Sequence, residues 1–223
     1  MDKNLKVFLN RLFKPYLEQG IERWFYIFGM NDKENNFVHI FSPFEYHKKY
    51  KGKSGKIDYI HYLKTLDDVE EKIRRAFATN WYVSPAYFTT ELYRMDYFGG
   101  TYWTYVDIDF KHYIDVNDVN KVKEFAKELT EKIIKTCDPD MTVFSGGGLH
   151  VYKQLDRMLN DKNEWKKEER KLVECVKNVG VEPDPIVSNN IINILRIPGT
   201  INLRYKDGNC LLYTSPSPRD RQK

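Results

Sequence analysis

Residues 102–110, with the sequence YWTYVDIDF, constrain the fold of this 223-residue chain more than any other segment. Aromatic and β-branched residues favour a β-strand, in which successive side chains point to opposite faces. Thr104 and Val106 would therefore face one side of a sheet, while Tyr105, Asp107 and Asp109 face the other. Because two carboxylates interrupt an otherwise apolar strand, we expect one face of the sheet to be partly open.

The spacing of apolar residues predicts the elements that surround this strand. Helical spacing predicts four helices, at 5–17, from Asp67 onward, at 117–136 and at 162–178. Short apolar runs predict strands, the first two as a hairpin, at 24–28, 37–41, 141–144, 149–152 and 191–197. This order indicates an α+β fold with a mixed or antiparallel sheet flanked by helices, as one domain over 1–209.

Composition limits where such a domain acts. No stretch approaches the roughly 20 apolar residues that span a bilayer, and the N-terminus lacks the pattern of a signal peptide. We therefore expect a cytoplasmic protein with no membrane association. The cysteines Cys137, Cys175 and Cys210 are scattered singly, which predicts neither a disulfide framework nor a CxxC zinc pair. Any metal ion should accordingly have oxygen ligands.

The last residues resemble a cloning by-product more than a protein element. The sequence CLLYTSPSPRD at 210–220 resembles the translation of a transposase-type sequencing adapter. We therefore predict that 210–223 is not native and that the natural chain continues past Asn209. This tail carries Arg219, Arg221 and Lys223 against Asp220, so the net charge of +4 falls to +2 without it. Net charge is thus weak support for nucleic-acid binding.

Asp107 and Asp109 form the first candidate site. Two residues apart on a strand, they leave the same face about 6–7 Å from one another. Carboxylates this close repel unless a cation lies between them, and Mg²⁺ or Mn²⁺ suits oxygen ligands and phosphate oxygens together. Two such ions could activate a primer 3′-hydroxyl and stabilise pyrophosphate. The alternative is a pair of aspartates on the solvated face of an edge strand.

A glycine-rich hairpin forms the second candidate site. Ser145, Gly146, Gly147 and Gly148 join the two strands before His150. Glycines let backbone amides approach an anion closely, and Ser145 and His150 could donate to a triphosphate. The turn is not a Walker loop, because no Lys-Ser or Lys-Thr follows it. Alternatively, it is a plain tight turn followed by a structural histidine.

The third candidate site combines an aspartate and an arginine. Asp184 lies between two prolines, and Arg196 ends an apolar segment at the Pro198-Gly199 turn. An arginine fixed in this way suits bidentate pairing with a phosphate. The alternative interpretations are a turn residue for Asp184 and a surface arginine for Arg196.

Together, VDIDF, SGGGLH and DPIV…ILRIPGTIN resemble the three motifs of the archaeo-eukaryotic primase superfamily, over about 102–202. The resemblance implies a catalytic core with an RRM-like palm and DNA-templated primer synthesis during DNA replication. It implies two groups of site residues: catalytic and metal-binding Asp107, Asp109 and Asp184, and nucleotide-binding Ser145, Gly146, Gly147, Gly148, His150 and Arg196. Implied cofactors are Mg²⁺ or Mn²⁺, as two ions.

The resemblance also implies partners: a single-stranded DNA template, NTP or dNTP, and a helicase or large primase subunit, fused or separate. The second motif is one residue shorter than in cellular replicative primases, with glycines in place of arginines. Both features, and the ending PGTIN, are more similar to plasmid, phage and viral primase-polymerases, which favours a mobile-element enzyme.

Two other functions are compatible with the same sequence. A metal-dependent phosphodiesterase or nuclease would activate water with the same carboxylates. A non-catalytic module for single-stranded nucleic acid would keep the fold without needing the carboxylates. For the template of a primase, the tyrosines and lysines within 46–64 could form a groove that stacks bases and binds phosphates, although this composition also suits an AT-rich genome.

Overall fold

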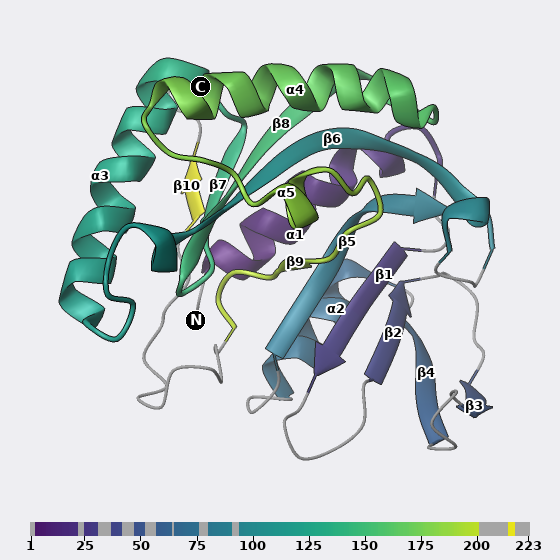
Figure 1. The fold of residues 1–223 in the computed structure, drawn as a ribbon. Helices are drawn as coiled ribbons and strands as arrows, with labels where there is room; N and C mark the ends of the chain where they lie inside the picture. Colours follow the sequence, from purple (N-terminus) through teal and green to yellow (C-terminus); the bar gives the residue numbers. More distant parts are fainter. Residues whose placement is uncertain are drawn as a thin grey trace.

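The computed structural model describes residues 3–21, 25–30, 37–41, 47–51, 57–63, 65–75, 80–90, 94–200 and 214–216. The strands are β1 (Phe25–Met30), β2 (Phe37–Phe41), β3 (His47–Lys51), β4 (Ile57–Leu63), β5 (Asn80–Phe88), β6 (Phe98–Asp109), β7 (Met141–Phe144), β8 (Gly148–Leu159), β9 (Leu195–Arg196) and β10 (Thr214–Pro216). They form one mixed sheet in the order β10-β7-β8-β6-β5-β1-β2-β4-β3, with β9 paired to β5 (Figure 1). Only β2 and β4 pair in parallel among the described strands.

The helices cover this sheet, and the predicted α+β class is confirmed. They are α1 (Lys3–Leu17), α2 (Leu66–Arg75), α3 (Val119–Cys137), α4 (Lys162–Asn178) and α5 (Pro185–Ser188), with 3₁₀ turns η1 (Met95–Tyr97) and η2 (Phe110–His112). The four predicted helices and the β1–β2 hairpin are present. The four-residue α5 was not predicted.

The predicted strand at 191–197 is wrong except for β9. Tyr105 explains the difference, because its hydroxyl donates to Asn190 O and accepts from Asn193 N at 3.2 Å. A side chain thus takes backbone groups that a strand would have paired. The segment is held as turns against β6 and becomes extended only at Leu195.

Aspartates begin three of the helices. Asp118 accepts from two backbone N–H groups at the start of α3, and Asp161 does the same for α4. Asp184 caps α5 by accepting from Ile186 N, with Pro185 at the first helical position. Such caps satisfy backbone donors that have no partner within the helix. The third capping aspartate is also a predicted site residue.

β6 pairs with β5 only near its beginning. The register joins Phe98, Gly100 and Thr101 to β5, and beyond this point the edge of β6 is bonded by other segments. Trp103 O accepts from the Trp165 indole at 2.9 Å, and Asp107 N donates to Ser188 Oγ at 3.2 Å. The chain between α5 and β9 therefore fills the space between β6 and β5 (Figure 1).

α1 packs along one face of β6 and β8. Its contacts run from Tyr16, whose hydroxyl lies 3.1 Å from Thr101 Oγ1, to Phe8, whose ring meets Tyr152 edge-on at 6.0 Å. Between them the Trp103 indole donates to a backbone carbonyl of α1. Tyr152 is opposite Tyr105 in the β6–β8 register. The α1 contacts thus reach this row of the sheet.

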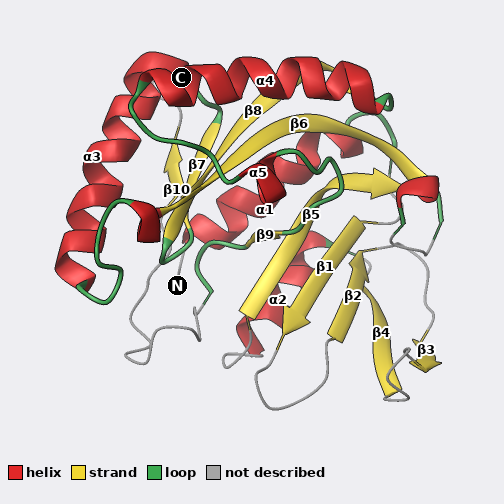
Figure 2. Ribbon diagram, viewed as in Figure 1, coloured by secondary structure: helices red, strands yellow, loops and turns green. Residues whose placement is uncertain are grey.

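α3 and α4 cover the opposite face (Figure 2). Their apolar side chains pack on Val106, Ile108 and Val151, which alternate with the residues facing α1. Burial of these side chains holds both helices to the sheet. β6 is therefore sandwiched between two apolar layers along most of its length.

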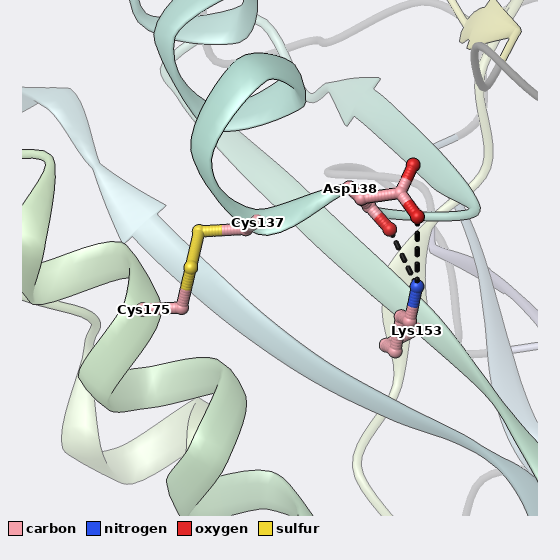
Figure 3. Close-up of a disulfide and its surroundings, with 4 residues drawn as sticks. All are labelled: Cys137, Asp138, Lys153 and Cys175. Carbon is pink, nitrogen blue, oxygen red and sulfur yellow. Dashed lines mark hydrogen bonds and ion pairs between the residues drawn. A yellow bond between two sulfur atoms is a disulfide. The ribbon is translucent and has the colours of Figure 1, made fainter.

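Cys137 and Cys175 are joined by a disulfide, with their Cα atoms 5.7 Å apart (Figure 3). The prediction that the cysteines form no disulfide is therefore wrong for this pair. Spacing along the chain could not reveal it, because the residues are 38 positions apart and meet only where α3 packs beside α4. Cys210 lies outside the described residues.

Thr214–Pro216 forms β10 and pairs with β7, although it belongs to the segment predicted not to be native. The rest of that segment lies outside the described residues, and the predicted domain limit stays a prediction. Among the described helices, none is both long and apolar enough to cross a membrane. β3 and β4 include part of the predicted base-stacking groove, but its side chains lie outside the described part of the chain.

Candidate functional site

The first candidate residues lie on β6, in the part of the β6–β8 pairing that follows the Tyr105–Tyr152 pair. Asp107 is opposite His150, and Asp109 is opposite Gly148. Their side chains leave the same face as Tyr105, because positions two apart on a strand face the same way. The pair predicted from VDIDF therefore lies at the end of β6, next to the glycine turn.

Asp184 joins this pair from a distant part of the chain. Its backbone N–H donates to Asp107 O at 2.7 Å. The neighbouring Ser188 Oγ accepts from Asp107 N, so both backbone groups of Asp107 are bonded to the α5 segment. Asp184 is thereby fixed against the edge of β6 that does not pair with β8, beside the aspartate pair.

Asp107 has an electrostatically unfavourable environment. Burial raises its pKa to about 7, with further contributions from the negative charges of Asp184 and Asp109. Its side chain is 18% exposed, and His150 Nε2 lies 3.4 Å from Oδ1. A carboxylate that is buried among other carboxylates favours either a bound proton or a nearby cation. The cluster therefore has the electrostatic character of a cation site.

The pKa of Asp109 is shifted in the opposite direction. Burial alone would raise its pKa, but hydrogen bonds and the positive charge of Lys111 keep the pKa below its ordinary value. Lys111 Nζ lies 2.5 Å from Oδ2, while Lys111 N donates to Oδ1 at 3.1 Å. Lys111 thus provides a positive charge at the place where a metal ligand was predicted.

The glycine turn is built against the end of β6. Gly146 has a φ of +93°, which residues with a side chain rarely adopt. A Cβ atom on Gly148 would lie 2.5 Å from Ile108 O, so the close approach of the two strands requires glycine there. Gly147 O accepts from Phe110 N at 2.9 Å, and Ser145 N donates to Gly148 O at 2.9 Å. The segment is therefore a tight turn, a geometry that both interpretations share, and anion binding stays a prediction.

His150 is buried beside the carboxylates and has an unusual ring. Burial lowers its pKa to about 3, with a further contribution from the charge of Arg196, so the ring is neutral at physiological pH. Its Nδ1 atom is buried and has no hydrogen-bond partner among the described residues. Buried polar atoms are normally bonded, so an unbonded nitrogen at a candidate site calls for an explanation beyond packing.

Arg196 is held in place by β5. Its Nη1 donates to Asn80 Oδ1 at 2.7 Å, its Nη2 donates to the Tyr82 hydroxyl at 2.8 Å, and its guanidinium lies 4.8 Å from the centre of the Tyr82 ring. These contacts follow from the pairing of β9 with β5, which places Arg196 opposite Tyr82. The arginine is thus oriented by its neighbours and lies close enough to His150 to affect its pKa.

The donor set suits a hard divalent cation, because Asp107, Asp109 and Asp184 offer only oxygen ligands. The repulsion that raises the pKa of Asp107 would be relieved by such a charge. In the described part of the chain, however, no three acidic, histidine or cysteine side chains are already arranged around one metal position. Asp109 faces Lys111, and Asp184 Oδ1 accepts from Ile186 N. Metal binding would therefore require these side chains to turn.

Sequence reasoning missed several residues that position this site. Lys111 could have been found, since it follows Asp109 by two positions. Ser188, Asn80 and Tyr82 could not, because each acts on a partner between 81 and 116 positions away. Contacts of this kind exist only once the chain has folded.

A cavity of about 880 Å³ lies elsewhere, between β8 and α4. Its walls include the Cys137–Cys175 disulfide and residues at the end of β8 distant from His150. Two ion pairs lie within its lining, Arg157 with Glu164 and Lys171 with Glu168. The lining includes none of Asp107, Asp109 and Asp184, so the cavity is separate from the carboxylate cluster.

Comparisons with known proteins give limited information. No protein-family model matches the chain, and no curated protein matches it. Among solved structures, the fold is similar to the "Polymerase Domain from Mycobacterium tuberculosis Ligase D in complex with DNA", with a TM-score of 0.48 and 13% identity. That match covers 88% of this chain and 76% of the other. The function of this chain is therefore inferred from its own site.

Proposed function

We propose that this chain is a nucleotidyltransferase that makes primers on a single-stranded DNA template from NTP or dNTP. The position of Asp184 carries this proposal. Its N–H donates to Asp107 O at 2.7 Å, so a third carboxylate lies alongside the pair from β6. Once their side chains turn, three neighbouring carboxylates could supply oxygen ligands for a two-metal site of phosphoryl transfer. The raised pKa of Asp107 supports a cation at this position.

In this proposal, Asp107, Asp109 and Asp184 hold two Mg²⁺ or Mn²⁺ ions. When bound, such ions supply the charge that activates a 3′-hydroxyl and neutralises departing pyrophosphate. Arg196 binds the triphosphate of the incoming nucleotide, because its guanidinium is already oriented by Asn80 and Tyr82. A turn of the His150 ring, whose side chain is 7% exposed, would bring its unbonded Nδ1 to the same nucleotide. Ser145 and the amides of Gly146, Gly147 and Gly148 contribute further donors.

A primer-synthesis assay tests the proposal. The protein is incubated with a labelled single-stranded template, Mg²⁺ or Mn²⁺ and all nucleotides, and products are separated by size. We expect ladders of new, template-complementary strands that disappear on addition of EDTA. Ribonucleotides and deoxynucleotides supplied in separate reactions would show which is used.

Matched variants separate the proposal from its rivals. Asp107→Asn should remove synthesis, whereas Asp156→Asn, on the far part of β8, should not. Shortening of the template without new strands would show a nuclease instead. Template binding that persists without any metal-dependent reaction, and that is unchanged in Asp107→Asn, would show a non-catalytic binding module.

A further inference from the structure

Tyr113 joins the turn after Asp109 to the segment that carries Asp184. Its hydroxyl accepts from Glu182 N at 2.6 Å and donates to Glu182 O at 3.3 Å. Tyr113 follows Asp109 by four positions, and Glu182 precedes Asp184 by two. One phenol therefore occupies both backbone groups of a residue that is 69 positions away in the chain.

The Tyr113 ring is itself fixed by an aromatic row. It stacks on Phe125 of α3, with ring centres 6.0 Å apart and an interplanar angle of 23°. Phe125 meets Phe110 edge-on at 5.0 Å, and Phe110 stacks on Phe144 at 6.1 Å. Phe110 and Phe144 are buried, so the row is anchored in the core between α3 and the sheet. The hydroxyl thus has a defined position although Tyr113 is 36% exposed.

Asp184 is consequently held at two points. Its own N–H is bonded to Asp107 O, and the bonds to Tyr113 begin two residues earlier, at Glu182. The first contact fixes Asp184 relative to Asp107. Among the described residues, the second contact joins it to the turn that follows Asp109, which η2 holds directly at the end of β6. Without the Tyr113 hydroxyl, the α5 segment could move relative to Asp109 while remaining bonded to Asp107.

We infer that Tyr113 is a positioning residue that sets the separation between Asp109 and Asp184. This inference rests on the proposed function, in which both carboxylates hold divalent ions. Ions in two-metal sites lie about 3.5–4 Å apart, so a small displacement of one carboxylate would weaken binding. Residues that orient metal ligands typically change metal affinity by roughly 10–100-fold when they are removed.

The test variant is Tyr113→Phe, which keeps the stacked ring and removes the hydroxyl. Direct Mn²⁺ binding is measured from the loss of the free-ion EPR signal, with wild type, Tyr113→Phe and Asp184→Asn side by side. We expect Tyr113→Phe to raise the apparent Kd for Mn²⁺ by about tenfold while Tm falls by no more than about 2–4 °C. Tyr97→Phe makes the same chemical change before the start of β6 and should bind Mn²⁺ as wild type does.

A second measurement separates positioning from general damage. In primer synthesis, Tyr113→Phe should need more Mn²⁺ for half-maximal rate while its KM for nucleotide stays constant. If wild type binds Mn²⁺ and Tyr113→Phe binds it equally well, the role of Tyr113 is overturned and the proposed function stands. If the loss of Mn²⁺ affinity in Tyr113→Phe is accompanied by a larger fall in Tm than expected, the hydroxyl is merely structural and the inference is overturned. If wild type binds no Mn²⁺, the proposed function is overturned, and the inference with it.

Discussion

Two regions of the molecule differ in the charge that they present to a ligand: the carboxylate cluster of Asp107, Asp109 and Asp184, and the surroundings of Arg196. The cluster gathers like charges, and the pKa of Asp107 rises to about 7 through burial and the nearby Asp184 and Asp109. Around Arg196, by contrast, neutral groups of Asn80 and Tyr82 accept hydrogen bonds from the guanidinium. The cluster gathers negative charge that a cation would offset, whereas the arginine presents positive charge on an oriented planar group. One region is thus prepared for a cation and the other for an anion.

The largest expected effect comes from Asp184→Asn. Asparagine is as good a helix cap as aspartate, so α5 and the fold should be kept. The loss of a metal-binding charge should lower kcat for primer synthesis by at least about 100-fold, since even residues around such ligands cost up to that much. Activity within a fewfold of wild type, in a primer-extension time course, would remove Asp184 from the cluster.

Arg196→Lys tests the other region. Lysine keeps the charge but cannot donate to Asn80, Tyr82 and a phosphate from one planar group. Hydrogen bonds to charged groups contribute about 1.5–3 kcal/mol, so KM for nucleotide should rise about 10–100-fold with Mn²⁺ affinity unchanged. Loss of Mn²⁺ affinity in this variant would show that the two regions are not independent.

The pKa of Asp107 predicts how the cluster responds to pH. A metal ligand must be deprotonated, so below pH 7 the apparent Mn²⁺ affinity should fall by about tenfold per pH unit. In the absence of metal, fold stability depends on pH in the opposite direction. Because the folded pKa of Asp107 is above the unfolded value of 3.8, its contribution to stability is lost as pH rises towards 7. Mn²⁺ titrations and Tm measurements at pH 5–8, compared with Asp107→Asn, check both statements. A pH-independent affinity would contradict the buried, repelled state of Asp107.

Lys111→Gln should strengthen Mn²⁺ binding slightly. Lys111 is 56% exposed, and exposed ion pairs contribute only about 0.2–1 kcal/mol. Because Lys111 competes with a metal ion for Asp109, its removal should tighten Mn²⁺ binding by about two- to fivefold. Lys121→Gln, which removes the exposed pair with Asp118, is the matched control and should change nothing. Weaker binding in Lys111→Gln would mean that the lysine organises the cluster.

Cys175→Ser should leave both regions unchanged. The disulfide closes a loop of 38 positions away from the carboxylates, and loss of such a bond typically costs about 2–4 kcal/mol of unfolding free energy. Denaturant unfolding with and without reductant should show this loss in wild type and no reductant effect in the variant. A change in KM or Mn²⁺ affinity would connect the α3–α4 contact to the site.

Much of the fold was predictable because local patterns agree with tertiary packing. The amphipathic spacing within 162–178 and the alternation within 102–110 both follow from which side chains are buried. The prediction at 191–197 was wrong because Tyr105 bonds the backbone there, and the disulfide was missed because its cysteines are distant in sequence. Local pattern carries no information about such partners.

The sequence by itself determined the residue types of the site: three carboxylates, a glycine turn, a histidine and an arginine. Only the tertiary structure decided their electrostatic states. Asp107 and Asp109 are equivalent in the sequence pattern, yet burial beside Asp184 raises one pKa while Lys111 lowers the other. The physical reason is that a pKa depends on desolvation and on charges within a few ångströms, and folding alone brings those charges together.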